Sequence, residues 1–223
     1  YLTEDRSDGL FYRFIPTTPG RLAEGGRLQA MALKDAPSAD TSNRTQRLWA
    51  VGDWREVEWI DMEDVHSPND DLRMRGHAAG AALVSRGEGV FWGEGELYLT
   101  ATSGGPIERG QILRYQPAGE DGGRVQLFVE STDEKALNMG DNLTVAPWGH
   151  LVVCEDNYSP TIHNHVKGVD AQGHLYTIAR NVVEGNSEFA GAVFSPDGRT
   201  LFVNIQNPGV TYAITGPWGR ISA

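Results

Sequence analysis

Short runs of alternating apolar and polar residues follow one another along the chain and are separated by turns rich in glycine and polar residues. Alternation with a period of two is typical of half-buried β-strands, so the pattern predicts an all-β chain built from hairpins. We expect four such strand pairs: residues 1–5 with 10–14, 95–102 with 111–115, 149–156 with 174–178, and 198–206 with 210–214.

The strand pairs recur at a spacing of roughly 45–55 residues, which is the period of propeller blades. A β-sandwich would also contain evenly spaced short strands, but it gives no reason for acidic residues to recur at the same place in each unit. We therefore predict a β-propeller of which this chain forms only a part, with residues 1–223 in a single domain.

One region interrupts the repeat, at about residues 35–80. It shows little alternation, and its tryptophans Trp49, Trp54 and Trp59 lie five residues apart, which matches neither a strand nor a helix. We expect an irregular excursion whose tryptophans pack onto the blades. Within it, Asn69, Asp70 and Asp71, followed by Leu72 and the alanines up to 82, predict a short helix.

Composition and charge narrow the possible functions. With 27 glycines and 11 prolines the chain is rich in turn residues. A formal net charge of −11 argues against a nucleic-acid partner, because phosphate backbones require a basic surface. An anionic substrate would need bound cations to reverse the local field. No apolar run reaches the roughly 20 residues of a membrane span, so no membrane partner is expected either.

Two features bear on cellular location. The single cysteine, Cys154, excludes an internal disulfide and leaves the redox compartment open. The chain begins at Tyr1 without a methionine, in what looks like the middle of a strand, so we expect an upstream segment to be missing. The lack of a visible signal peptide then says nothing about export.

Acidic residues recur at corresponding places in the repeat, mostly at strand ends. In a propeller the innermost strands line a central channel, so such side chains would converge on one axis. Clustered carboxylates need a counter-charge, and hard cations prefer oxygen ligands. The positions are Glu4-Asp5, Glu88, Asp141, Glu155-Asp156 and Glu188.

Several of these segments together resemble the PhoX-type alkaline phosphatase family. The most specific is residues 188–206, continued by 211–218, and the tetrapeptide Arg86-Gly87-Glu88-Gly89 also matches. The resemblance extends over nearly the whole chain, is weakest at 35–75, and covers only the C-terminal half of the family's length. The other matching segments are residues 1–6, 12–16, 141–147 and 154–156.

The resemblance implies a propeller that is six-bladed at full length, with calcium and ferric iron at its centre, hydrolysing phosphate monoesters after export to the periplasm or the medium. It implies that Arg86 grips the substrate phosphate and that Glu88 binds metal at the catalytic centre. The further metal-ligand candidates are Glu4, Asp141, Glu155, Asp156 and Glu188. The family's upstream cysteine and upstream acidic motifs are absent from this chain, so the fragment alone is expected to hold only part of the site.

Two other readings of the residues stay open. A calcium-dependent, lactonase-type propeller hydrolase would also use central carboxylates, and a non-enzymatic propeller could bind a partner through the tryptophan-bearing region. The sequence leaves open the metals, the preferred ester, the oligomeric state and the roles of Cys154, His163 and His165. His163 and His165 could form a metal-binding pair on a strand, but their neighbours favour a loop.

Overall fold

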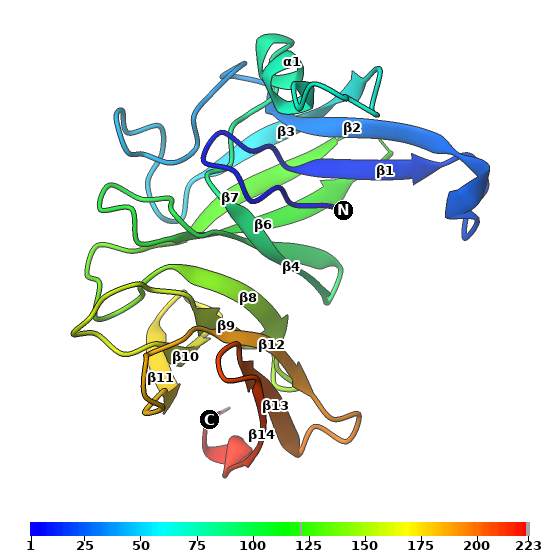
Figure 1. The fold of residues 1–223 in the computed structure, drawn as a ribbon. Helices are drawn as coiled ribbons and strands as arrows, with labels where there is room; N and C mark the ends of the chain where they lie inside the picture. Colours follow the sequence, from blue (N-terminus) through cyan, green and yellow to red (C-terminus); the bar gives the residue numbers. More distant parts are fainter. Residues whose placement is uncertain (121, 222–223) are drawn as a thin grey trace.

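The computed structural model describes residues 1–120 and 122–221 and is built almost entirely of antiparallel β-strands (Figure 1). The largest sheet has seven strands in the order β1-β2-β3-β7-β6-β5-β4. Their bounds are β1 Tyr12–Pro16, β2 Gly26–Leu33, β3 Trp54–Met62, β4 Gly87–Gly93, β5 Glu96–Ala101, β6 Gln111–Ala118 and β7 Gly122–Glu130.

Two smaller sheets follow in chain order and form the lower half of the molecule in Figure 1. A four-stranded sheet contains β8 Gly140–Val145, β9 Leu151–Glu155, β10 His165–Val169 and β11 Leu175–Arg180. A three-stranded sheet contains β12 Phe189–Phe194, β13 Thr200–Ile205 and β14 Val210–Thr215. The helix α1 (Leu72–Ala78) and two 3-10 turns (Leu22–Glu24 and Trp218–Arg220) complete the described elements. No helix among these residues is long and apolar enough to cross a bilayer.

The all-β prediction is confirmed, and two of the four strand pairs are present as expected. Strand β5 pairs with β6, and β13 pairs with β14. The predicted pair of 1–5 with 10–14 is reduced to one bridge between Leu2 and Tyr12, because β1 pairs with β2 instead. The predicted partner of β9 is different: β9 pairs with β8 and β10, and the segment at 174–178 belongs to β11, which pairs with β10. Strand β10 was overlooked because it follows a long polar loop and has only five residues.

The region at 35–80 is more regular than its sequence pattern indicates. It contains the nine-residue strand β3, which lies between β2 and β7 in the large sheet. Trp49 is 2% exposed and packs in the sheet's core, and Trp59 packs against that core. The helix α1 is present as predicted. The tryptophans therefore do pack onto the sheet, but two of them lie within a strand.

Two of the hydrophobic cores lie between successive sheets. One core joins β6 and β7 to β8 and β9 through Ile112, Phe128 and Leu143, among others. Another joins the four-stranded sheet to the three-stranded one through Val152, Phe189 and Leu201, among others. This stacking of sheet faces brings the first strands β4, β8 and β12 next to one another, as in the blades of a propeller.

A glycine allows the closest of these approaches. A Cβ atom on Gly89 would lie 2.4 Å from the backbone oxygen of Asp141. The Thr100 hydroxyl, on β5, also donates a hydrogen bond of 2.7 Å to that oxygen. A larger residue at 89 would push β4 away from β8, so the glycine is required by the contact between the two sheets.

Candidate functional site

The three innermost strands share an irregularity at the same end. Strand β4 has a bulge between Gly87 and Val90, and β8 has one between Gly140 and Leu143. The register of β12 shifts between Ala190 and Val193. A β-bulge disrupts the pairing locally and re-aims side chains, and bulges are common beside active sites. All three irregularities lie where the predicted acidic residues occur.

Four of the predicted carboxylates gather at these bulges. Glu88 and Asp141 are themselves bulge residues, and Glu188 directly precedes β12. Asp156 directly follows β9, and its backbone N–H donates to Met139 just before β8. We call Glu88, Asp141, Asp156 and Glu188 the axial carboxylates.

The axial carboxylates contact one another, so they cannot all be ionised at low cost. Burial, a hydrogen bond with Glu88 and the negative charges nearby raise the pKa of Asp141 to about 8. Burial, a hydrogen bond with Asp156 and the same negative charges raise the pKa of Glu188 to about 7. The cluster therefore holds protons near neutral pH that a cation could replace.

Arg86 lies beside this cluster, immediately before β4, in a left-handed backbone conformation with φ of 53°. Its Nε donates a 2.8 Å hydrogen bond to Asp5. Its Nη2 lies 2.7 Å from Glu88 Oε1 and 3.8 Å from Asp156 Oδ2. Burial lowers the pKa of Arg86, but the bond to Asp5 and the charges of Glu88 and Asp5 outweigh this effect and raise it, so the guanidinium stays charged.

The structure does not bring Glu4 into the cluster. Its backbone oxygen accepts a bond from Gly87, but its carboxylate turns toward Tyr12, whose hydroxyl donates at 2.9 Å, and the Leu10 N–H, which donates at 3.2 Å. Arg73 lies 3.7 Å from the other oxygen. Glu4 therefore has its own donors, and its predicted role as a ligand gains no support from its placement.

Glu155 also points away from the axial carboxylates, because neighbouring residues of a strand face opposite sides. Its side chain is 1% exposed and accepts bonds of 2.9 Å from the Asn138 N–H, the His165 N–H and His165 Nδ1. Burial raises the pKa of Glu155 to about 7, although Lys167 opposes the shift. Burial and Lys167 lower the pKa of His165 to about 4, so its ring is neutral and, in the Nδ1–H tautomer, donates to the carboxylate.

The other two residues left open by the sequence are now placed. Cys154 is fully buried, and burial, with the charges of Asp141 and Glu188, raises the pKa of its thiol to about 12. It is therefore an unreactive thiol beneath the cluster. His163 lies in the loop between β9 and β10, whereas His165 begins β10, so the two do not form a pair on one strand face.

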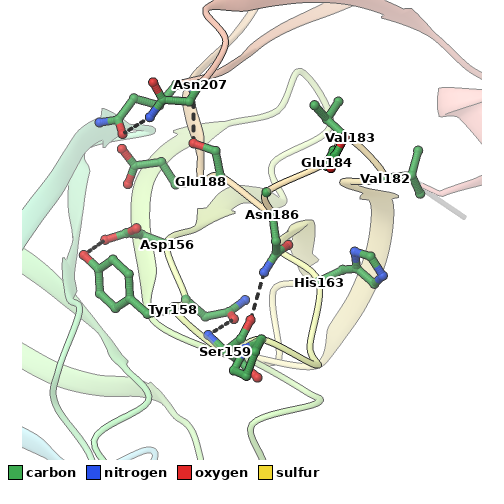
Figure 2. A pocket seen from close by; sticks show the side chains of 15 residues that line it. Asp156, Tyr158, Ser159, His163, Val182, Val183, Glu184, Asn186, Glu188 and Asn207 are labelled. Atoms are coloured by element: carbon green, nitrogen blue, oxygen red, sulfur yellow. Dashed lines mark hydrogen bonds between the residues drawn. The ribbon is translucent and has the colours of Figure 1, made fainter.

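A pocket of about 780 Å³ opens beside Asp156 and Glu188, as Figure 2 shows. Its walls are the loop from 156 to 163, the loop from 182 to 188, and Gln206 with Asn207. Tyr158 stands at its edge and donates a 2.7 Å hydrogen bond to Asp156 Oδ2. Sequence reasoning missed Tyr158, because a lone tyrosine in a polar loop carries no pattern.

Asn142 lies in the matching segment 141–147, to which sequence reasoning gave no role beyond Asp141. Its side-chain oxygen accepts a 2.9 Å bond from the Ala192 N–H and so joins the bulges of β8 and β12. Asn142 thereby sets the separation of the two strands whose ends carry Asp141 and Glu188. The fold and this site together define a propeller-type protein with one arginine and four carboxylates at the ends of its inner strands.

Comparison with known proteins agrees with that description. The profile of the family described as alkaline phosphatase PhoX matches residues 1–209, so the chain belongs to the PhoX family. A solved structure, Pseudomonas fluorescens PhoX in complex with vanadate, a transition state analogue, superposes with a TM-score of 0.69 at 19% identity. The match covers 92% of this chain and 45% of that one, so this chain spans just under half of that length. No curated protein matches the chain.

Proposed function

We propose that this chain supplies the arginine and part of the metal ligands of a phosphatase that hydrolyses phosphate monoesters. The observation that carries the proposal is the environment of Arg86. Its guanidinium is held by Asp5 and Glu88, with Asp156 nearby, yet 22% of the side chain stays exposed. A planar guanidinium oriented by carboxylates can present two N–H groups to phosphate oxygens.

The comparisons support the same reaction class. The family is described as an alkaline phosphatase, and the Pseudomonas fluorescens relative was captured with vanadate, an analogue of the transition state. In phosphoryl transfer the charge spreads over the equatorial oxygens, so catalysis depends on positioning and on stabilising that charge. Arg86 has the position and the charge for this role.

Calcium and iron are part of the proposal, and the donor set fits hard cations. The axial carboxylates offer only oxygen donors, and Glu88 Oε1 is buried without a well-aligned hydrogen bond. Nevertheless, across residues 1–120 and 122–221 no three His, Cys, Asp or Glu side chains are arranged to hold one ion as they stand. We therefore assign Glu88, Asp141, Asp156 and Glu188 as contributors to a shell completed by other ligands.

Bound cations would neutralise the phosphate and generate a nucleophile from water near neutral pH. The chain's own residues do the remaining work. Arg86 orients the phosphate, Glu88 and Asp5 orient Arg86, and Asp156 connects the cluster to the pocket. From the family resemblance, we also propose that the protein is exported to the periplasm or the medium.

The test is Arg86→Lys in the whole protein that contains this chain. Lysine keeps the charge and loses the two-pronged contact, so we expect kcat and kcat/KM on phosphate monoesters to fall about ten- to a hundredfold. Arg27→Lys is the matched control, because Arg27 forms a single exposed ion pair with Asp61. Unchanged kinetics in Arg86→Lys would contradict the proposal.

Elemental analysis separates the roles of neighbouring residues. Arg86→Lys should keep the wild-type content of calcium and iron, whereas Glu88→Gln should lose metal first and activity as a consequence. A Glu88→Gln protein with full metal content would remove Glu88 from the ligand set.

A further inference from the structure

The pocket beside the axial carboxylates has room for more than a phosphate group. At about 780 Å³ it lies in the range of pockets that enclose whole small molecules. It begins at Asp156 and Glu188 and lies between two loops, and Tyr158 at its edge also interacts with Arg86. A phosphate held at Arg86 would therefore direct the rest of its ester into this space.

The two walls are joined before any ligand arrives. Asn164 is fully buried, and its side chain bonds to the backbone of Asn157 on one loop and of Asn186 on the other. The Asn186 amide in turn donates to the backbone oxygens of Ser159 and Ile162, and the bond to Ser159 is drawn in Figure 2. The pocket is thus preorganised, which reduces the entropy lost on binding.

Tyr158 is an exposed aromatic ring with a fixed orientation. The residue is 73% exposed, but its hydroxyl is tied to Asp156 at 2.7 Å. The ring also borders a second hollow, lined by Arg109 and Met139 among others. An aromatic side chain that is anchored at its polar end and solvated along its faces can stack against a flat ligand without reorganising.

The opposite wall carries hydrogen-bonding groups with spare capacity. Asn207 donates to Gln206 Oε1 at 3.3 Å, which leaves the Gln206 amide nitrogen and the Asn207 side-chain oxygen without a partner among the described residues. The His163 ring likewise makes no hydrogen bond within the described ranges. These groups can meet the hydroxyls or ring nitrogens of a ligand whose flat face lies on Tyr158.

We infer that the pocket takes the alcohol portion of the ester and that Tyr158 stacks on a planar ring in it. The favoured substrates are then nucleoside and aryl phosphates rather than phosphates of open-chain alcohols. This inference rests on the proposed phosphatase function and extends it to the substrate class. Tyr158 acts on the selectivity of the site through its ring, whereas its hydroxyl contacts Asp156 and Arg86 at the edge of the phosphate site.

The experiment compares two variants of Tyr158 in the whole protein. Tyr158→Phe and Tyr158→Ala both lose the hydroxyl contacts to Asp156 and Arg86, but only Tyr158→Ala loses the ring. We measure kcat/KM for a nucleoside 5′-monophosphate, for p-nitrophenyl phosphate and for glycerol 2-phosphate. Relative to Tyr158→Phe, Tyr158→Ala should lose about tenfold on the two ring esters, a typical effect of one lost stacking contact, and less than about twofold on glycerol 2-phosphate.

Two further variants serve as controls for this interpretation. Tyr158→Leu keeps apolar bulk without an aromatic face and should behave like Tyr158→Ala. Tyr212→Ala removes an exposed tyrosine on β14 and should leave all three rates unchanged.

The outcomes separate the inference from the function on which it rests. A loss confined to the nucleotide or to both ring esters supports stacking. Comparing the nucleotide with p-nitrophenyl phosphate shows whether any planar ring is enough for the effect or whether a nucleoside is needed. Equal losses on all three esters would overturn the stacking role and leave the phosphatase proposal standing. A wild-type protein that turns over none of the three esters would overturn both.

Discussion

Glu155 and Asp156 are adjacent in the chain, yet they lie in two different chemical environments. Glu155 is enclosed by three N–H donors from Asn138 and His165. Asp156 faces Glu188, Tyr158 and Arg86 across the site. The carboxylate of Glu155 is satisfied by the protein itself, whereas Asp156 belongs to a group with more negative charge than donors. The difference indicates which carboxylates organise the fold and which are available to a cation.

Glu4 and Glu88 show the same contrast in the N-terminal part. Their backbones lie side by side. The backbone oxygen of Glu4 accepts a hydrogen bond from the Gly87 N–H, and the Thr3 hydroxyl donates to the backbone oxygen of Glu88. The Glu4 carboxylate nevertheless bonds Tyr12 and Leu10, whereas that of Glu88 contacts Arg86 and Asp141. Counting donors around each carboxylate thus divides six candidates into two groups.

The largest expected effect is on stability, from Glu155→Ala. This change leaves two backbone N–H groups and a ring nitrogen without their acceptor in a buried place, so we expect a loss of about 4 kcal/mol in the free energy of unfolding. Urea denaturation measures it. Glu58→Ala, at an exposed position of β3, is the control and should change stability by less than about 0.5 kcal/mol. A loss below about 1 kcal/mol for Glu155→Ala would contradict the proposal that the fold requires Glu155 whereas Asp156 is available to a cation.

An intermediate effect is expected from pH on the cation-free protein. The pKa values of Asp141, Glu188 and Glu155 are raised in the fold to about 8, 7 and 7, so between pH 4 and 8 the folded state binds more protons than the unfolded chain. The free energy of unfolding is then greatest below about pH 4, near the pKa values of these carboxyls in the unfolded chain, and it falls as the pH rises.

Denaturation in a chelator should show this loss, on the order of 2 kcal/mol between pH 5 and 8. Added calcium and iron should restore the part of this loss that comes from Asp141 and Glu188 at pH 8, because a cation stabilises the ionised axial carboxylates. A cation-free protein that becomes more stable over this range would contradict the assignment of shared protons.

The smallest effect on stability is expected from Asp141→Asn, and it is a gain where the other effects are losses. Removing one ionisable group relieves the repulsion, so in chelator at pH 8 the variant should be more stable than wild type by about 1 kcal/mol, and at pH 5 the gain should vanish. Its metal content should fall at the same time. A destabilised Asp141→Asn protein at pH 8 would place Asp141 with Glu155, among the carboxylates that the fold requires.

Much of the architecture could be read from local patterns. Alternation and turn residues predicted β5, β6, β13 and β14 at nearly their observed places, and Leu72 with the preceding acids predicted α1. Strand β3 was missed because exposed, half-buried and buried residues follow one another irregularly from Trp54 to Met62, so the strand lacks clear alternation. A mixed environment weakens the signal that periodicity depends on.

By itself, the sequence determined the all-β class, the family resemblance and the list of acidic residues near strand ends, because each depends on residue types and short-range spacing. Only the tertiary structure decided which acids share one site. That choice follows from bulges in β4, β8 and β12, which arise between paired strands, and from the close contact at Gly89, which brings two sheets together. Side-chain direction at a strand end depends on such long-range pairing, so Glu155 and Asp156 could not be separated by pattern alone.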